Sequence, residues 1–177
     1  MLGNLNLKNI LFLDIETVPQ HSSFEEVPEP LQIMWKKKFL QLKNKSEDET
    51  PDSIYRQAGI YAEFGKIVCI STGVLRKGSL WIKSFWGDDE KELLIRFCDM
   101  LNKAREKNIN YLCAHNGKEF DYPYLIRRML INGIAVPAIL DLSGKKPWEV
   151  NHIDTMELWK FGDFKNAFDI ESCMEDL

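Results

Sequence analysis

The chain has 177 residues, of which 45% are hydrophobic and 28% are charged, and its net charge is −4. This composition excludes a disordered chain, collagen and a coiled coil, and the length favours one domain with a sizeable buried core. The acidic balance also disfavours a protein that coats duplex DNA through charge alone. No apolar run approaches the roughly 18–20 residues of a membrane span, so we expect no membrane partner.

The first predicted element is a strand over residues 10–19, a short unbroken apolar run that meets two carboxylates and then a proline. A polar stretch follows at about 20–65, and within it residues 31–42 carry apolar side chains near helical spacing. We therefore expect a charged helical insertion at about 20–65.

The later elements alternate. Residues 66–75 and 79–86 are β-rich and joined by a short turn, which predicts a hairpin, and a helix is expected from Asp88 or Asp89 to about 107. A strand at 111–116, a helix at 121–130, a short strand at 150–154 and the start of a helix at 156–160 follow. This order predicts an α/β fold with a mixed five-stranded sheet flanked by helices.

Asp14 and Glu16 end the first predicted strand. They are two residues apart, so the pleat of a strand puts both side chains on one face, at the edge where open α/β sheets bind ligands. Two carboxylates this close repel each other unless a cation or a shared proton lies between them, and Mg²⁺ or Mn²⁺ is the natural partner. The alternative is that both side chains simply face solvent.

A second cluster is the segment HNGKEFDYPYL, residues 115–125, which leaves a predicted strand, turns at Asn116-Gly117 and enters a helix at Asp121. Two interpretations of Asp121 stay open: it completes a metal site with Asp14 and Glu16, or it is only the N-cap of the helix. We expect Phe120 to pack inward as a core residue.

DIETVP (residues 14–19) and HNGKEFDYPYL resemble the first two motifs of the DEDD-type, DnaQ-like 3′–5′ exonucleases. The second motif is most similar to the exonuclease domain of family B DNA polymerases and the stand-alone bacterial exonucleases related to it. The resemblance covers most of the chain and implies a ribonuclease H-like fold.

The resemblance also implies a mechanism. Asp14 bridges two Mg²⁺ or Mn²⁺ ions, Glu16 binds one of them and helps place the attacking water, and Asp121 holds the other. The reaction is hydrolysis of the terminal phosphodiester at the 3′ end of DNA or RNA, with single-stranded DNA as the expected partner. The residues expected to contact the nucleic acid are Asn116, Thr17, Phe120 and Arg127.

The family pattern breaks late in the sequence. The family has a fourth aspartate on a late helix, and no Tyr-x-x-x-Asp or His-x-x-x-x-Asp follows Trp159. Asp154 stands where the family has a structural Asp-Thr pair, so it is not assigned as a ligand. We therefore expect one exonuclease domain over residues 1–177, truncated at its C-terminal helix and of weak activity. The candidate substitutes for the fourth aspartate are Asp169, Glu171, Glu175 and Asp176.

Two other functions stay open. One is a catalytically incomplete remnant that binds nucleic acid or a protein, and the other is an unrelated hydrolase that uses Asp14 and Glu16 as acid and base. The paired basic residues Arg127 and Arg128 are near enough to Asp121 in sequence to reach a phosphate, with a solvated surface as the default. Trp35, Trp81 and Trp86 are expected to pack in the core or on a helix face. The four scattered cysteines indicate reduced thiols and a cytoplasmic location.

Overall fold

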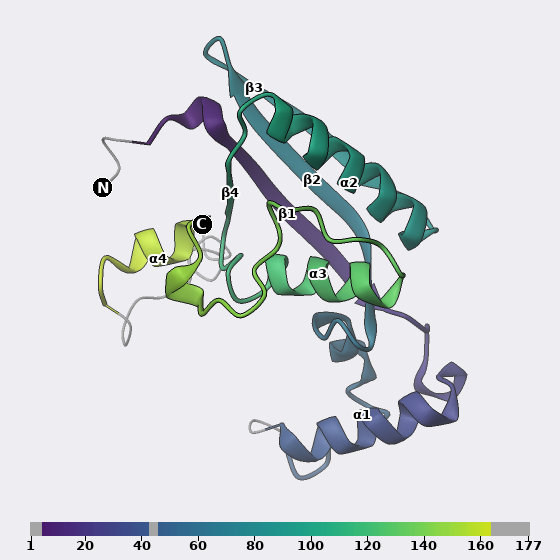
Figure 1. Ribbon diagram of the computed structural model, residues 1–177. Coiled ribbons are helices and arrows are strands. Elements are labelled where there is room, and N and C mark those ends of the chain that lie inside the picture. The colour runs from purple at the N-terminus through teal and green to yellow at the C-terminus, as the bar shows by residue number, and fades with distance from the viewer. Residues whose placement is uncertain (1–4, 43–45, 164–177) are drawn as a thin grey trace.

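The structure is a computed structural model that describes residues 5–42 and 46–163 (Figure 1). It contains one five-stranded sheet in the order β3-β2-β1-β4-β5. The strands are β1 (Ile10–Pro19), β2 (Gly65–Arg76), β3 (Ser79–Trp86), β4 (Tyr111–Ala114) and β5 (Ile153–Asp154). The first three are antiparallel neighbours, whereas β4 runs parallel to β1 and β5 runs parallel to β4. This ribonuclease H-like strand order, with β1 in the centre, confirms the expected fold class.

The longest helix is α2 (Glu90–Glu106), which packs on β2 and β3 (Figure 1). It begins where the Asp89 side chain accepts the backbone N–H of Glu92 at 3.0 Å, so Asp89 is the N-cap, one of the two residues that the sequence offers. Its apolar stripe is buried against the sheet, and the rings of Phe97 and Phe85 lie 5.9 Å apart. The stripe consists of Leu93, Leu94, Phe97 and Leu101.

The helix α3 (Asp121–Ile131) joins the same core through Leu125 and Met129. A buried ion pair fixes it to the start of α2, because Arg128 donates to both carboxylate oxygens of Glu90, at 2.9 and 2.5 Å. Glu90 also accepts the backbone N–H of Ile67 in β2 at 2.7 Å. The carboxylate of Glu90 therefore connects two helices and a strand. Because its ion pair with Arg128 is buried, removal of either partner is strongly destabilising.

The segment between β1 and β2 contains α1 (Glu29–Gln41) and its own small hydrophobic cluster. Trp35 is its centre: the side chain is fully buried, and its indole N–H donates to the carbonyl of Pro51 at 2.6 Å. The expected helix of the insertion is thus present, and Trp35 is a core residue as predicted. Trp81 and Trp86, which we expected to be packed, are instead exposed on the edge strand β3.

The largest difference from the sequence-based expectation is in the last strand, whereas the other elements differ by at most two residues at their ends. The last strand, β5, has only two residues, because the chain ahead of it at Pro147–Glu149 forms a 3₁₀ turn and only Ile153 and Asp154 pair with β4. The following helix, α4 (Thr155–Lys160), begins at once, capped by the side chain of Asp154. None of the helices that the structure describes is long and apolar enough to cross a membrane.

Candidate functional site

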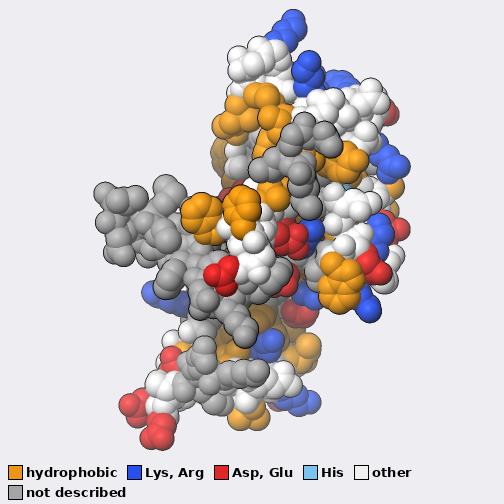
Figure 2. Space-filling view, turned by 90° about the vertical axis from the view of Figure 1, so that its left-hand side faces the viewer, with side chains coloured by type: hydrophobic (Ala, Val, Ile, Leu, Met, Phe, Trp, Pro, Cys, Tyr) orange, Lys and Arg blue, Asp and Glu red, His pale blue; other side chains and the backbone are white. Residues whose placement is uncertain are grey.

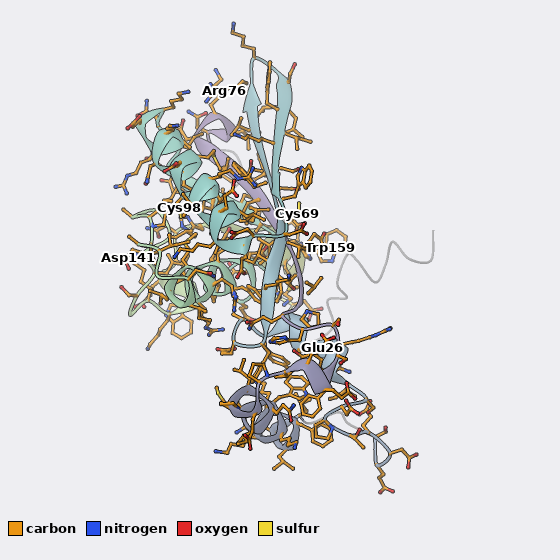
Figure 3. The ribbon with its side chains drawn as sticks, turned by 90° about the vertical axis from the view of Figure 1, so that its right-hand side faces the viewer. Glu26, Cys69, Arg76, Cys98, Asp141 and Trp159 are labelled. Atoms are coloured by element: carbon orange, nitrogen blue, oxygen red, sulfur yellow. The ribbon has the colours of Figure 1, made fainter. Side chains whose placement is uncertain are left out.

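The strand β1 places Asp14 and Glu16 on the face of the sheet away from α2. Buried Ile15 lies between them on the α2 side, and both acidic side chains are exposed. Their antiparallel neighbours on β2 are Ser71 and Cys69, and the register shifts just beyond Glu16. Small neighbours leave the space around the two carboxylates open. In Figure 3, Cys69 in the sheet and Trp159 of α4 mark this side, and Cys98 marks the α2 side.

The turn that leads from β4 to α3 depends on Gly117. A Cβ atom at this position would lie 2.5 Å from the Cβ of Ala114 and 3.0 Å from the ring of Tyr122, closer than real atoms approach. The preceding Asn116 adopts a left-handed conformation with a φ of 55°, which asparagine tolerates better than most residues. The Asn-Gly pair therefore allows the chain to turn sharply enough to bring the start of α3 against β1.

Asp121 lies beside the part of β1 that has no pairing partner on β4. The last pair between the two strands is Phe12 with Cys113, and beyond it the carboxylate of Asp121 accepts the backbone N–H of Ile15. Its side chain is only 3% exposed and lies close enough to Asp14 for the two charges to repel. Burial, reinforced by the Asp14 carboxylate, raises the pKa of Asp121 to about 7.

The N-cap alternative for Asp121 is wrong. Phe120 occupies the cap position, and Asp121 is the first residue of α3, with its side chain turned to β1. The structure therefore brings two of the three predicted carboxylates together, Asp14 and Asp121, although they are far apart in sequence. Glu16 shares the exposed face with Asp14 but lies one step further along the strand.

The donor set fits a hard divalent cation in its chemistry. Asp14 and Asp121 supply carboxylate oxygens, the ligands that Mg²⁺ and Mn²⁺ prefer. Burial, and then repulsion by Asp14, raises the pKa of Asp121, and a bound cation would relieve that repulsion. Among the described residues, no three His, Cys, Asp or Glu side chains are grouped so that they hold a metal ion in this conformation. The assignment of ligands stays a prediction.

The sequence profile of the exonuclease domain of DNA polymerase family B matches residues 10–174. The chain belongs to this family. A solved family B DNA polymerase from the hyperthermophilic archaeon Pyrobaculum calidifontis is similar at 17% identity and a TM-score of 0.37. The match covers 71% of this chain and 11% of the polymerase, so the chain spans about a tenth of that protein. A comparison with curated protein sequences gave no match.

Asp154 has a structural role in this exonuclease domain. Its buried carboxylate accepts the backbone N–H groups of Asn116, Lys118 and Met156 at 2.9, 3.1 and 3.0 Å. These bonds hold the Asn-Gly turn against the start of α4, which agrees with the sequence-based decision not to treat Asp154 as a ligand. The four acidic residues named as substitutes, Asp169, Glu171, Glu175 and Asp176, lie outside the described residues.

The four residues predicted to contact nucleic acid lie in different environments. Asn116 forms the turn just described, and Phe120 is half-buried with its ring 5.4 Å from Tyr124, as expected for a core residue. Thr17 is half-buried and hydrogen-bonds the Tyr124 hydroxyl. Arg127 is exposed, and its Nε lies 4.0 Å from a carboxylate oxygen of Glu63. Their contact with a substrate stays a prediction.

Two residues have roles that the sequence reasoning missed. Arg128, considered with Arg127 as a phosphate contact, is buried in the ion pair with Glu90 and donates to the carbonyl of Ala62 at 2.9 Å. Tyr124 donates to the carbonyl of Gly59 at 2.7 Å. Both side chains point from the helix that carries Asp121 to the end of the insertion. Their i, i+4 spacing on one face of α3 was the available signal.

Proposed function

We propose that this chain is a divalent-metal-dependent 3′–5′ exonuclease domain, which hydrolyses the terminal phosphodiester at the 3′ end of single-stranded DNA or RNA. The observation that carries the proposal is the buried approach of Asp121 to Asp14 at the free edge of β1. No Lys or Arg side chain of the described residues forms an ion pair with these two carboxylates. Two carboxylates held together in this way favour a bound metal ion over a purely structural role.

The proposed ligands are Asp14, Glu16 and Asp121, with Mg²⁺ or Mn²⁺ as the cofactor and two ions in the full family site. A bound ion of this kind lowers the pKa of a coordinated water and offsets charge on the phosphate. The protein contributes a fixed geometry. Ile15 ties the Asp121 carboxylate to β1, and Asp154 holds the Asn-Gly turn that precedes it.

The substrate has room on the open side of the site. Asp14 and Glu16 are exposed, and the small residues Ser71 and Cys69 lie beside them on the sheet. We propose that Asn116, Thr17, Phe120 and Arg127 contact the strand, of which Arg127 is the exposed cation. The described cysteines Cys69, Cys98 and Cys113 are all free, which supports the proposed cytoplasmic location.

The test is a degradation assay on single-stranded DNA labelled at its 5′ end, with Mg²⁺ or Mn²⁺ and with an EDTA control. We expect products shortened stepwise from the 3′ end, and none with Asp14→Asn or Asp121→Asn. Glu119→Gln changes an exposed acidic residue two positions before Asp121 and is the matched control, expected to retain activity. Low turnover, which the sequence predicts for this chain alone, stays a prediction of the same assay.

The other candidates give different results. An acid–base hydrolase that uses only Asp14 and Glu16 keeps its activity after Asp121→Ala and needs no metal. Calorimetry with Mn²⁺ distinguishes the binding remnant, which takes up one ion or none, from the two-ion nuclease. Hydrolysis that survives both EDTA and Asp121→Ala would overturn the proposal.

A further inference from the structure

A groove of about 570 Å³ lies between α2 and the β2–β3 hairpin. It is on the opposite face of the sheet from Asp14 and Glu16. Lys83, which lines it, pairs with Thr72, and Thr72 pairs with Leu13, so all three share one face, while Asp14 points to the other. Figure 1 shows α2 running alongside β2 and β3, and Figure 3 shows Arg76 near the hairpin tip. The groove is thus distinct from the carboxylate site.

Positive charge is concentrated in this groove although the chain as a whole is acidic. Its ionisable lining consists of five cations, all exposed, and one carboxylate: Arg76, Lys83, Arg96, Lys103, Lys107 and Asp99. Within the described part of the chain, none of the five cations lies within ion-pair distance of a carboxylate. Arg96 donates to the carbonyl of Trp86 at 2.9 Å and the Lys83 ammonium lies 4.7 Å from the centre of the Phe85 ring, but neither contact neutralises the charge. Cations along a cleft without carboxylate partners attract an anionic ligand and raise its local concentration.

The cations form two rows that face each other across an apolar floor. Arg96 and Lys103 are seven residues apart on one stripe of α2, and Lys107, four residues further on, is the residue that caps the C-terminal end of the helix. Arg76 and Lys83 lie on the hairpin. From residue 96 to 107 the helix axis advances about 16 Å, at 1.5 Å per residue. That is the length of four to five stacked nucleotides at about 3.4 Å each.

Trp81 adds an aromatic surface to the same groove. It lies on β3 two residues before Lys83, therefore on the same face, and its side chain is 66% exposed. A large exposed indole next to unpaired cations is the combination with which proteins bind single strands, because every base has a face that stacks. The bases of a duplex are already stacked on each other, and the acidic side chains of a peptide have no aromatic face to stack on the indole.

We propose that this groove binds single-stranded nucleic acid, with the five cations contacting phosphates and Trp81 stacking on a base. The preference for nucleic acid over an acidic peptide rests on the proposed function as well as on Trp81. A strand held here is a second contact, on the face opposite to the carboxylates. It therefore increases the affinity for long strands and leaves the reaction at the 3′ end unchanged.

The test measures binding without hydrolysis. The 177-residue chain is titrated into a fluorescein-labelled thymidine oligonucleotide about 20 nucleotides long, in EDTA, at several salt concentrations. The groove variant is Lys103→Ser with Lys107→Ser. The control is Lys91→Ser with Arg105→Ser, which removes the same charge from exposed positions of the same helix outside the groove.

For the groove variant we expect the slope of log K against log salt to fall by about 1.4, at about 0.7 for each lost phosphate contact on a single strand. Trp81→Ala should weaken binding at least about fivefold, and Trp81→Phe should retain part of it. The proposal is overturned if the groove and control variants bind alike, or if polyglutamate displaces the oligonucleotide at equal charge concentration. If the wild-type chain binds the oligonucleotide in EDTA but does not hydrolyse it with Mg²⁺, the result counts against the proposed nuclease function and not against the groove.

Discussion

Replacing Asp121 by asparagine should stabilise the metal-free protein at neutral and alkaline pH. The carboxylate is buried beside Asp14, and this environment raises its pKa from an ordinary 3.8 to about 7. A carboxyl group whose pKa is raised by folding stabilises the protein fully below its unfolded pKa. That contribution is lost as the pH rises to the folded pKa. Asparagine keeps the shape and the oxygen that accepts the Ile15 N–H, but it is never charged.

The magnitude follows from the two pKa values. The interval between 3.8 and about 7 corresponds to roughly 4 kcal/mol, at about 1.4 kcal/mol for each pKa unit. Between pH 5 and pH 8 the wild type crosses the upper part of this interval, from pH 5 to about 7. The stability of Asp121→Asn relative to the wild type should therefore increase by about 3 kcal/mol over that range. For a chain of this size, that is a relative rise in Tm of roughly 6–12 °C.

The assay is urea or thermal unfolding of both proteins in EDTA at pH 5, 6, 7 and 8. Because other groups also titrate, the measured quantity is the difference between the variant and the wild type at each pH. Glu119→Gln, at an exposed position in the same segment, is the control and should give a difference that is independent of pH. Parallel curves for Asp121→Asn and the wild type would refute the reasoning, because they would mean that Asp121 is neither desolvated nor close to Asp14.

Three further predictions follow from packing and from the proposed metal site. Mn²⁺ should raise the Tm of the wild type more at pH 8 than at pH 5.5, because Asp121 must lose its proton to bind the ion, and it should leave the Tm of Asp121→Asn unchanged. Equal Tm shifts at the two pH values in scanning fluorimetry would contradict this. Glu90→Ala leaves Arg128 buried without its carboxylate and should cost about 3–5 kcal/mol in urea unfolding, so a loss below 1 kcal/mol would refute the role of the pair. Gly117→Ala should destabilise by roughly 1–3 kcal/mol through its clash with Ala114, and an unchanged Tm would show that the turn relaxes freely.

Most of the fold follows from local patterns in the sequence. The strand Ile10–Pro19 has the predicted bounds, and Asp89 begins the helix that its apolar stripe predicts. Such elements are predictable because their burial repeats with the period of the backbone. Trp81 and Trp86 were placed wrongly since hydrophobicity alone does not reveal that β3 is an edge strand. The face drawn in Figure 2 has hydrophobic side chains at its surface in several places, with acidic side chains among them.

The candidate site was only partly predictable. That Asp14 and Glu16 share a face follows from the pleat of a strand and needs no tertiary information. The burial of Asp121, in contrast, depends on where β4 ends relative to β1, and no local pattern encodes that distance. Arg127 and Arg128 show the same limit, because adjacent cations on a helix point about 100° apart and only the tertiary structure decides which one is buried.

Two buried aspartates at comparable positions show how hydrogen bonding separates a structural carboxylate from a chemical one. Asp121 and Asp154 both lie at the start of a helix that follows a strand of the sheet. Asp154 accepts three backbone N–H groups, which compensate its charge and leave it little capacity for another ligand. Asp121 accepts its own backbone N–H and that of Ile15, but burial and the facing carboxylate of Asp14 outweigh these bonds and raise its pKa, so its charged form is disfavoured until a cation binds. Asp154→Asn should therefore destabilise the protein at pH 8, where Asp121→Asn stabilises it.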